Sequence, residues 1–234
     1  MNHHKTIYRS QAEQYEELVS RQPDLDLELA EIRPADGLDV VDLGAGTGRL
    51  SRYLASGSAS YIATDLSQSM LDVLAAKAAA GGYGQRIRTV VADHRELPLP
   101  DASADLVVSG WSIGYIASSK EPSWEAGLET VMAQLRRILR PDGTVVILET
   151  LGTGVDEPVR LDFLAPYFER LERRYGFAHR TVRMDYPFPS VEEAARVCGF
   201  FFGDWLAERI CSRGWSVVPE HCGIWWKHDF GQLG

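Results

Sequence analysis

Short apolar runs alternate with longer amphipathic segments along most of this chain. The apolar runs, bounded by polar or glycine-containing turns, predict strands at about residues 38–43, 60–64, 87–92, 104–109 and 144–149. Helical periodicity predicts helices at about 10–20, 25–32, 48–56, 67–81 and 123–139. Strands that alternate with helices pair in parallel through right-handed crossovers, so the pattern indicates an α/β protein with a mostly parallel sheet.

A glycine-rich turn follows the first predicted strand. Residues 40–48 read Val-Val-Asp-Leu-Gly-Ala-Gly-Thr-Gly, which places an acid at Asp42 and glycines at Gly44, Gly46 and Gly48. A strand that runs through such a turn into a helix lets backbone approach a ligand closely and offers free N–H groups to a carboxylate or phosphate. We therefore expect a nucleotide-like cofactor at this turn.

The glycine spacing differs from the dinucleotide fingerprint, which has glycines at relative positions one, three and six. The sixth position is Arg49 when counted from Gly44 and Ser51 when counted from Gly46. A second acid, Asp65, ends the next predicted strand, 21 positions after Gly44. A carboxylate there can accept both hydroxyl hydrogens of a ribose and would repel a 2′-phosphate.

Four segments together resemble the class I S-adenosylmethionine-dependent methyltransferases. Residues 40–49 resemble the first motif of that family, 62–70 its acidic second motif, 90–98 the strand end that meets adenine, and 135–144 the helix and turn before the fifth strand. The resemblance covers about residues 36–150 and is specific for fold and cofactor. It leaves the acceptor open, although small-molecule members such as the ubiquinone and menaquinone biosynthesis group are similar.

The resemblance implies a doubly wound α/β fold, with a seven-stranded, mostly parallel sheet, a Rossmann-like cofactor site and an antiparallel closing strand. We expect one domain over residues 1–234, in which 1–35 form an N-terminal helical lid and 36–150 the cofactor-binding core. A substrate-side insertion would follow at 151–190. Residues 191–234 would supply the two closing strands, near 203–210 and 222–228.

The resemblance also places the cofactor at the carboxyl ends of the first four strands. Asp42 would orient the turn or accept from the cofactor ammonium, Asp65 would hold the ribose, and Asp93 would accept from the adenine amine or cap the next segment. The His94 backbone N–H would meet an adenine nitrogen, with its side chain in solvent. The full expected set is Asp42, Gly44, Ala45, Gly46, Asp65, Leu66, Met70, Asp93, His94, Ser109, Gly110 and Trp111, of which Leu66 and Met70 would pack on the adenine.

The reaction that the resemblance implies is in-line transfer of a methyl group to an oxygen, nitrogen or carbon atom of a small molecule. Aligning two bound reactants can supply up to ~7–11 kcal/mol, so no covalent intermediate is needed. A general base is required only when the acceptor starts protonated. His94, His179 and His221 are candidates, but no motif identifies any of them, so the catalytic residue stays unassigned.

Aromatic residues suggest where the acceptor binds. Trp111 and Tyr115 follow the fourth strand, and Tyr8 and Tyr15 lie on the expected lid. The insertion 151–190 adds an aromatic-rich stretch with a helical stripe, made of Leu161, Leu164, Phe168 and Leu171. Such a stripe is usually core, but an insertion here can also roof an acceptor pocket. The aromatic lining favours a flat or apolar molecule such as a quinone or phenol, and it also suits stacking on an amine cation.

Composition narrows the partners. The net charge is −9, and the arginines from Arg136 to Arg140 and from Arg170 to Arg174 fit solvated helix faces, so nucleic acid is not expected. No apolar run is long enough to span a membrane and the start lacks a signal-peptide core, so we expect a cytoplasmic monomer or homodimer. Three cysteines without Cys-x-x-Cys spacing, expected as buried thiols of the final strands, and a solvated His3–His4 pair give no metal site.

Two other functions stay open. A nucleotide-dependent oxidoreductase that uses NAD would share the glycine turn and Asp65, but the third dinucleotide glycine is missing. A non-catalytic module that binds S-adenosylmethionine would keep every cofactor residue, so only methyl transfer distinguishes it from an enzyme.

Overall fold

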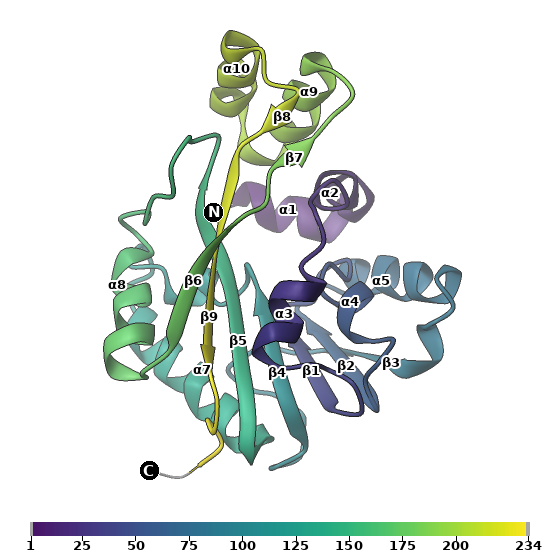
Figure 1. Ribbon diagram of the computed structural model, residues 1–234, viewed down its shortest axis with the longest axis vertical. Helices are drawn as coiled ribbons and strands as arrows, with labels where there is room; N and C mark the ends of the chain where they lie inside the picture. Colours follow the sequence, from purple (N-terminus) through teal and green to yellow (C-terminus); the bar gives the residue numbers. More distant parts are fainter. Residues whose placement is uncertain (1, 233–234) are drawn as a thin grey trace.

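A seven-stranded sheet organises the chain (Figure 1). The computed structural model describes residues 2–232. The strands are β1 (Asp39–Leu43), β2 (Ser60–Asp65), β3 (Ile87–Val91), β4 (Ala104–Gly110), β5 (Leu139–Thr153), β6 (Ala178–Arg183) and β9 (Glu220–Lys227), in the order β3-β2-β1-β4-β5-β9-β6. The first five pair in parallel, whereas β9 is antiparallel to both β5 and β6. The predicted mostly parallel sheet with an antiparallel strand is confirmed.

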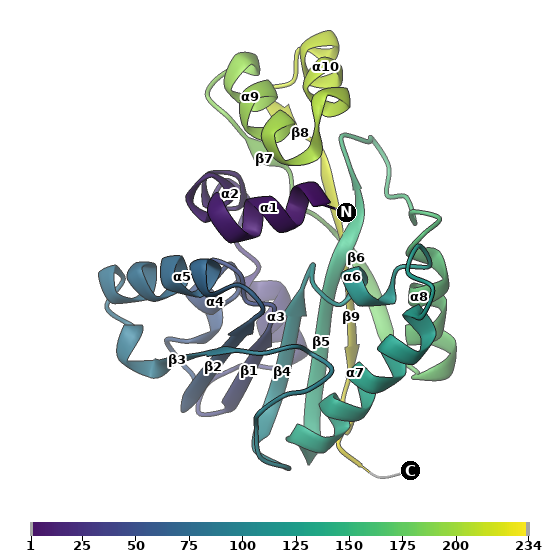
Figure 2. The same cartoon turned by 180° about the vertical axis from the view of Figure 1, so that it is seen from behind.

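Side chains alternate between the two faces of the sheet because successive residues of a strand point to opposite sides. Val41, Val107 and Val145 pack in one core with α7 (Trp124–Ile138) and α8 (Ala165–Glu169). Their neighbours Val40 and Val108 pack in a second core with α3 (Asp26–Ile32), α4 (Ser51–Leu54) and α5 (Gln68–Ala80). Helices therefore cover both faces, as Figures 1 and 2 show.

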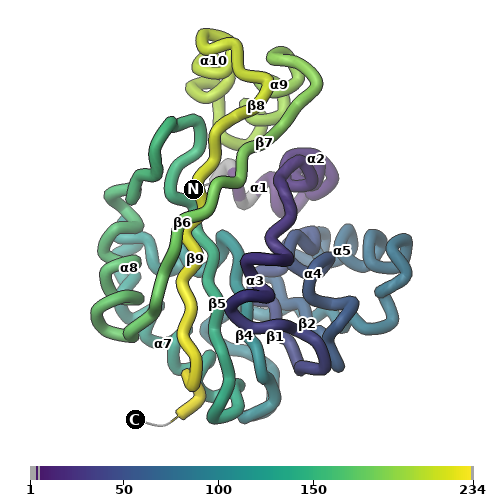
Figure 3. Tube along the Cα trace, viewed as in Figure 1, coloured from purple at the N-terminus to yellow at the C-terminus, as the bar shows by residue number. Residues whose placement is uncertain are grey.

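A small lobe rises beyond the carboxyl ends of the parallel strands. It contains α9 (Val191–Phe202), α10 (Asp204–Arg213) and the short pair β7 (Tyr186–Pro187) and β8 (Val217–Val218). The long strands β5 and β9 run up towards it, and α1 (Asn2–Ser10) and α2 (Ala12–Val19) lie between it and the sheet (Figures 1 and 3). The sheet edge that carries the predicted cofactor residues is thus covered by the chain's first helices.

Helix α2 connects the lobe to the sheet through contacts on both sides. Leu18 is buried in the lobe's core, and Arg21, just beyond α2, pairs with Glu193 of α9 at 2.7 Å. On the other side, Glu16 pairs with Lys77 of α5. These contacts join the N-terminal helical segment to both the small lobe and the sheet layer.

The remaining elements are short. Residues Gly84–Arg86 form the 3₁₀ turn η1, Gly114–Ala117 form α6, and a π-helical turn, η2, continues α8 over Arg170–Arg174. The expected helix at 48–56 is only the four-residue α4. No helix within residues 2–232 combines the length and the apolar character needed to cross a membrane.

One predicted closing strand is wrong. Gly203 precedes α10 and residues 204–210 lie in it, where Leu206 and Ile210 are buried four residues apart, the spacing of a helical face. The strand is instead β6, at 178–183, inside the segment expected as a substrate-side insertion. The expected strand at 222–228 is confirmed as β9.

Two expectations about isolated side chains are also wrong. Of the cysteines expected as buried thiols of the final strands, Cys222 is buried on β9, whereas Cys198 is buried on helix α9 and Cys211 is exposed on α10. His4 is not simply solvated, because its ring stacks on Phe201 with centroids 4.3 Å apart. The side chain of His3 lies outside the described residues.

Candidate functional site

The turn after β1 has a backbone that favours glycine. Gly44, Gly46 and Gly48 have φ angles of +68°, +54° and +86°, in the left-handed region that side chains disfavour. A Cβ at Gly44 would also overlap the side chain of Ser112. The spacing of these glycines in the sequence therefore reflects both backbone conformation and close packing.

Two carboxylates lie beside this turn. Asp42 is buried, and its Oδ2 accepts from the Tyr61 hydroxyl at 2.7 Å, while its Oδ1 has no hydrogen-bond partner. Burial raises the pKa of Asp42 to about 7, although the Tyr61 hydrogen bond opposes the shift. Asp65 accepts from the backbone N–H groups of Gly46 at 3.0 Å and Ser67 at 2.8 Å, and burial raises its pKa despite these bonds. Asp65 is therefore oriented by the glycine turn itself.

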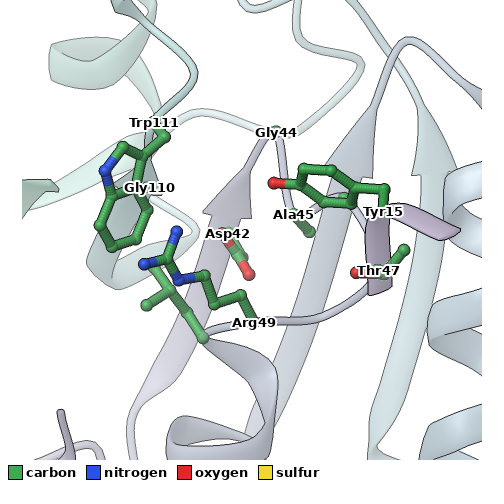
Figure 4. A pocket seen from close by; sticks show the side chains of 10 residues that line it. Tyr15, Asp42, Gly44, Ala45, Thr47, Arg49, Gly110 and Trp111 are labelled. Carbon is green, nitrogen blue, oxygen red and sulfur yellow. The ribbon is translucent and has the colours of Figure 1, made fainter. Parts of the chain in front are cut away.

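Arg49 and Trp111 cover the other side of the turn. The guanidinium carbon of Arg49 lies 3.1 Å from the centre of the Trp111 ring (Figure 4). The backbone of Trp111 is strained, with φ +51°. Its backbone N–H donates to the Leu148 carbonyl at 2.7 Å, and this hydrogen bond holds the residue in place. The Nε and Nη2 atoms of Arg49 are buried without a hydrogen-bond partner. A buried, unpartnered guanidinium beside a glycine turn favours an anionic ligand.

The space enclosed beneath the turn is small. Tyr15, Asp42, Arg49 and Trp111 are among the residues that line a cavity of about 20 Å³, which has room for about one water molecule. An amino-acid group fits there only if a lining side chain moves. Arg49 can move without losing a hydrogen bond from its Nε or Nη2 atom, since neither atom has a partner.

The loop after β3 is packed differently from the prediction for His94. The expected solvent exposure of this side chain is wrong, because only 7% of its surface is exposed and its Nε2 lies 2.7 Å from Ser112 Oγ. Burial lowers the pKa of His94 to about 4. The loop folds back onto Ser112, which also packs against Gly44, so His94 supports the glycine turn from behind.

Asp93 is held by its own turn. Its Oδ1 accepts from the Arg95 backbone N–H at 2.8 Å, and its Oδ2 accepts from the Arg95 guanidinium at 2.6 Å. The Arg95 hydrogen bond lowers the pKa of Asp93 to about 2. These contacts match the alternative in which Asp93 caps the next segment. The contact between Asp93 and adenine stays a prediction.

The other predicted cofactor residues divide into two groups. Leu66 is 69% exposed at the rim beside Asp65, so its side chain is available to a ligand. Met70 is buried, and its Cε would lie 3.4 Å from a Cβ at Gly46, so it packs beneath the glycine turn. Ser109 is also buried, with its hydroxyl donating to the Leu43 carbonyl at 3.1 Å, which ties β4 to β1. Ala45 and Gly110 line the small cavity.

A much larger cavity begins where the small one ends. It has a volume of about 540 Å³, within the usual range for small-molecule sites. Tyr15, Arg49 and Trp111 line both cavities. The rest of its wall comes from α1, α2, the segment after β4, the ends of β5 and β9, the insertion and the small lobe.

The predicted substrate-side tyrosines meet in this cavity. The hydroxyls of Tyr8 and Tyr115 lie 2.8 Å apart, and the rings of Tyr8 and Tyr15 are edge to face at 5.4 Å. His4 Nδ1 lies 3.0 Å from the Tyr115 hydroxyl. Phe201 of the small lobe packs on Tyr15, with ring centres 5.3 Å apart. Helix α1 therefore closes the cavity by aromatic contacts with two separate parts of the chain.

The insertion roofs the cavity only in part. Phe163 and Tyr186 line it, together with Leu161 and Leu164 of the expected stripe. Other aromatic residues of the insertion, Tyr167, Phe168, Tyr175 and Phe177, are buried in the core beside the sheet. Core packing therefore accounts for more of this segment than the acceptor wall does.

Two buried glutamates line the same cavity. Glu149, near the end of β5, is 4% exposed, and its Oε1 accepts from the Gly114 N–H at 2.7 Å. Glu220, at the start of β9, is 2% exposed, and its Oε1 accepts from the Thr150 hydroxyl at 3.2 Å. Burial raises the pKa of each to about 8.

The candidate histidines do not gather in the cavity. His179 is exposed on β6, and His221 is buried with its Nε2 3.2 Å from the Asp156 carbonyl. Neither lines the cavity, nor does His94. Within the part of the chain that the structure describes, no group of histidine, cysteine and acidic side chains has the arrangement of a metal site.

Sequence reasoning missed several residues of this site. Arg49 stood inside the quoted motif and Glu149 at the end of the fifth strand, positions that could have drawn attention to them. His4, Phe201 and Glu220 reach the cavity only through the fold, and no local pattern marks them.

The residues present fit S-adenosylmethionine. The unpartnered Oδ1 of Asp42 and the unpartnered nitrogens of Arg49 match an ammonium and a carboxylate at the glycine turn. Asp65 and the exposed Leu66 lie on the neighbouring strand end, where a ribose and an adenine would follow. This donor set suits a molecule with an amino-acid end and a nucleoside end.

Comparison with known proteins also indicates a methyltransferase. The family model described as "Methyltransferase domain" matches residues 41–147. The chain is 33% identical to a demethylmenaquinone methyltransferase of Clavibacter sepedonicus over 50% of this chain, but only 43% of that protein. It is 30% identical to a ubiquinone/menaquinone biosynthesis C-methyltransferase of Acidiphilium cryptum over 83% of this chain and 77% of that protein.

A solved structure supports the fold. The SAM-dependent methyltransferase from Aquifex aeolicus superposes with a TM-score of 0.57 at 16% identity, covering 87% of this chain and 88% of that one. At this identity the likeness concerns the fold alone. Together with the relative that matches most of both chains, the family model and the glycine turn lead to one conclusion: the chain belongs to the class I S-adenosylmethionine-dependent methyltransferases.

Proposed function

We propose that this protein transfers a methyl group from S-adenosylmethionine to a small molecule held in the larger cavity. The observation that carries the proposal is the shared wall: Tyr15, Arg49 and Trp111 line both the glycine-turn cavity and the cavity of about 540 Å³. A donor at the turn and an acceptor in the cavity would meet at these three side chains. Aligning two bound reactants in this way can lower the activation barrier of methyl transfer by up to ~7–11 kcal/mol.

The chain's own residues bind and orient the cofactor. Asp42 accepts from the ammonium, the Arg49 guanidinium moves from Trp111 to pair with the carboxylate, and Asp65 accepts from the ribose hydroxyls. The unpartnered atoms of Asp42 and Arg49 support the first two roles. Leu66 packs on the adenine, and the Asp93 carboxylate or the His94 backbone N–H meets its edge. When bound, the cofactor supplies a sulfonium methyl group that a nucleophile can attack in line.

Other residues exclude water from the larger cavity and shape the binding site for the acceptor. Helix α1 brings Tyr8 against Tyr115, which covers the cavity beside Trp111. Because most of the lining is apolar or aromatic, the acceptor has an apolar body. The two relatives named above are described as quinone-pathway methyltransferases, and a quinol is one acceptor of this kind. The cavity is roofed by the protein's own helices, which favours a small molecule over a macromolecule.

The alternative of a non-catalytic binding module differs only in turnover. The test measures S-adenosylhomocysteine binding by calorimetry, and then its formation from S-adenosylmethionine with a panel of small phenols, quinols and amines. We expect binding at micromolar concentration and acceptor-dependent formation of the product. Binding without turnover of any acceptor would favour the module, whereas binding of NAD in place of the sulfonium compound would favour the oxidoreductase.

A further inference from the structure

Glu149 lines the larger cavity, as does Trp111, one of the three residues that border both cavities. Glu149 follows Leu148, whose carbonyl accepts from the Trp111 N–H, and its own Oε1 accepts from the N–H of Gly114. A Cβ at Gly114 would lie 3.0 Å from Glu149 Oε2, so a glycine there leaves room for the carboxylate. Trp111 and Glu149 are thus fixed relative to one another by backbone hydrogen bonds, and both line the acceptor cavity.

Among the residues that the structure describes, no cation is paired with Glu149. Glu149 interacts electrostatically with Tyr115, Tyr167 and Cys222, and all three side chains are neutral at physiological pH. None of the ion pairs among residues 2–232 includes it. The two cations of the cavity wall are occupied by aromatic rings: Arg49 lies over Trp111, and Lys120 Nζ lies 3.8 Å from the centre of Phe163.

Glu220 shows the contrast within the same cavity. The positive charge of Arg49 acts on Glu220, and the hydroxyls of Thr153 and Thr150 also favour its ionised form. For Glu149, only the hydrogen bond from the Gly114 N–H favours the ionised form. A ligand cation would therefore gain more beside Glu149 than beside Glu220, because a buried charge without a partner is costly.

We infer that the acceptor is an amine with an apolar or aromatic body, and that Glu149 binds the nitrogen that receives the methyl group. This inference rests on the proposed methyl transfer and names its substrate class. The aromatic walls suit it, since Trp111, Tyr8 and Tyr115 can face a cation with their rings while the body of the molecule fills the apolar part.

The proton balance of the reaction follows from this placement. An ammonium group and the Glu149 carboxylate share one proton, and burial raises the pKa of Glu149 to about 8, so the carboxyl can hold that proton. The nitrogen lone pair is then free to form the bond to the methyl carbon as the sulfur keeps the electron pair of the broken bond. The product is an N-methylammonium and a neutral thioether, and the proton on Glu149 leaves to water when the product departs.

The test compares amines with neutral molecules of the same shape. The probes are benzylamine, phenethylamine and tryptamine, each paired with the alcohol in which a hydroxyl replaces the amino group, plus 4-ethylphenol. Calorimetry at pH 7.5 measures their binding to the protein saturated with S-adenosylhomocysteine. We expect at least one amine to bind at least tenfold more tightly than its alcohol, and the same amine to be methylated when S-adenosylmethionine is supplied.

Glu149→Gln keeps an oxygen for the Gly114 N–H and removes the charge, so we expect it to abolish the amine preference while S-adenosylhomocysteine still binds. Glu220→Gln should retain the preference, and so should Glu208→Gln, a surface control on α10. Equal binding of amines and alcohols, stronger binding of the phenol, or a preference that survives Glu149→Gln would each overturn the inference. So would a preference that only Glu220→Gln removes. Cofactor binding in these experiments separates such a failure from failure of the proposed function.

Discussion

The two cavities that meet at Trp111 are built in different ways. The glycine-turn side is made largely by one short stretch, residues 42–50, whose backbone conformation and buried Asp42 shape the binding surface. The acceptor side is made by side chains from at least five separate segments, and its wall is mostly aromatic and aliphatic. One side therefore depends on backbone geometry and the other on tertiary packing.

This difference determines which amino-acid substitutions each side can tolerate. A backbone that needs positive φ at three positions cannot accept other residues there without strain. A wall of packed side chains can change in shape while the fold stays intact, since helices α1 and α9 contribute to it from outside the sheet. The cofactor side should thus be uniform among proteins of this fold and the acceptor side variable.

The largest expected effect comes from adding one methyl group to the glycine turn. Gly44→Ala places a Cβ at φ +68° and into Ser112, so we expect a loss of about 2–5 kcal/mol in the free energy of unfolding. Calorimetry should show S-adenosylhomocysteine affinity falling by more than about 100-fold, because ~2.7 kcal/mol of misfit already gives that factor.

The matched control is Gly82→Ala, at φ +78° with no atom within 4 Å of the added Cβ. It should cost only the ~1–2 kcal/mol of left-handed strain and leave cofactor affinity unchanged. Equal effects of the two variants on affinity would mean that close packing at Gly44 has no role in binding.

The acceptor side is expected to respond to pH through Glu149. Burial raises its folded-state pKa from 4.5 to about 8, so its contribution to stability is fully present below about pH 4.5 and is lost as pH rises to 8. Glu149→Gln should therefore match the parent protein at pH 5. At pH 8.5 it should be more stable by on the order of a few kcal/mol.

Denaturant unfolding at the two pH values measures this difference. Glu208→Gln, on the exposed face of α10, should show no pH-dependent gain. A gain from Glu149→Gln that is the same at pH 5 and pH 8.5 would show that ionisation of this buried carboxyl is not its cause.

The sequence predicted the two sides unequally, and for the same physical reason. Short apolar runs indicated β1 to β5 because the central strands β1, β4 and β5 are buried over most of their length. The spacing of Gly44, Gly46 and Asp65 indicated the cofactor because those residues act through local geometry. Residues 203–210 were mistaken for a strand because the family resemblance implied two closing strands late in the chain, whereas the buried residues of this segment follow a helical period.

On the acceptor side, only residues near a recognised strand end or on the expected lid could be proposed. Tyr8 and Tyr115 were proposed separately as substrate-side residues, and the structure places their hydroxyls 2.8 Å apart. Phe201 could not be found, since its approach to the cavity depends on how the small lobe packs against α2. Glu220 could not be found either, since it reaches the cavity through the pairing of β9 with β5. His94 was placed in solvent because nothing local predicts that its loop folds onto Ser112.

A smaller effect is expected from Asp65→Ala, which sharpens the assignment of the cofactor side. The carboxylate would lose its bonds to the ribose, so S-adenosylhomocysteine affinity should fall tenfold or more, on the order of 1.5–3 kcal/mol. Asp65→Asn should retain part of the affinity, since one oxygen can still accept from the Gly46 N–H. Asp72→Ala, an exposed acid on α5, is the control, and calorimetry of unchanged affinity in Asp65→Ala would remove Asp65 from the site.

The smallest effect tests whether helix α1 is held over the acceptor cavity by its tyrosine. Tyr8→Phe removes the hydrogen bond to the Tyr115 hydroxyl but keeps the ring, so we expect a loss of about 1 kcal/mol in the docking of α1. Hydrogen exchange of amides in residues 2–10 should accelerate about fivefold, because local opening reports this free energy, while cofactor affinity stays within about twofold. Tyr83→Phe, at a residue that does not line the cavity, should leave the exchange of α1 unchanged. Exchange unaltered by Tyr8→Phe would mean that ring packing on Tyr15 and Phe201, not the hydroxyl pair, holds the helix over the acceptor.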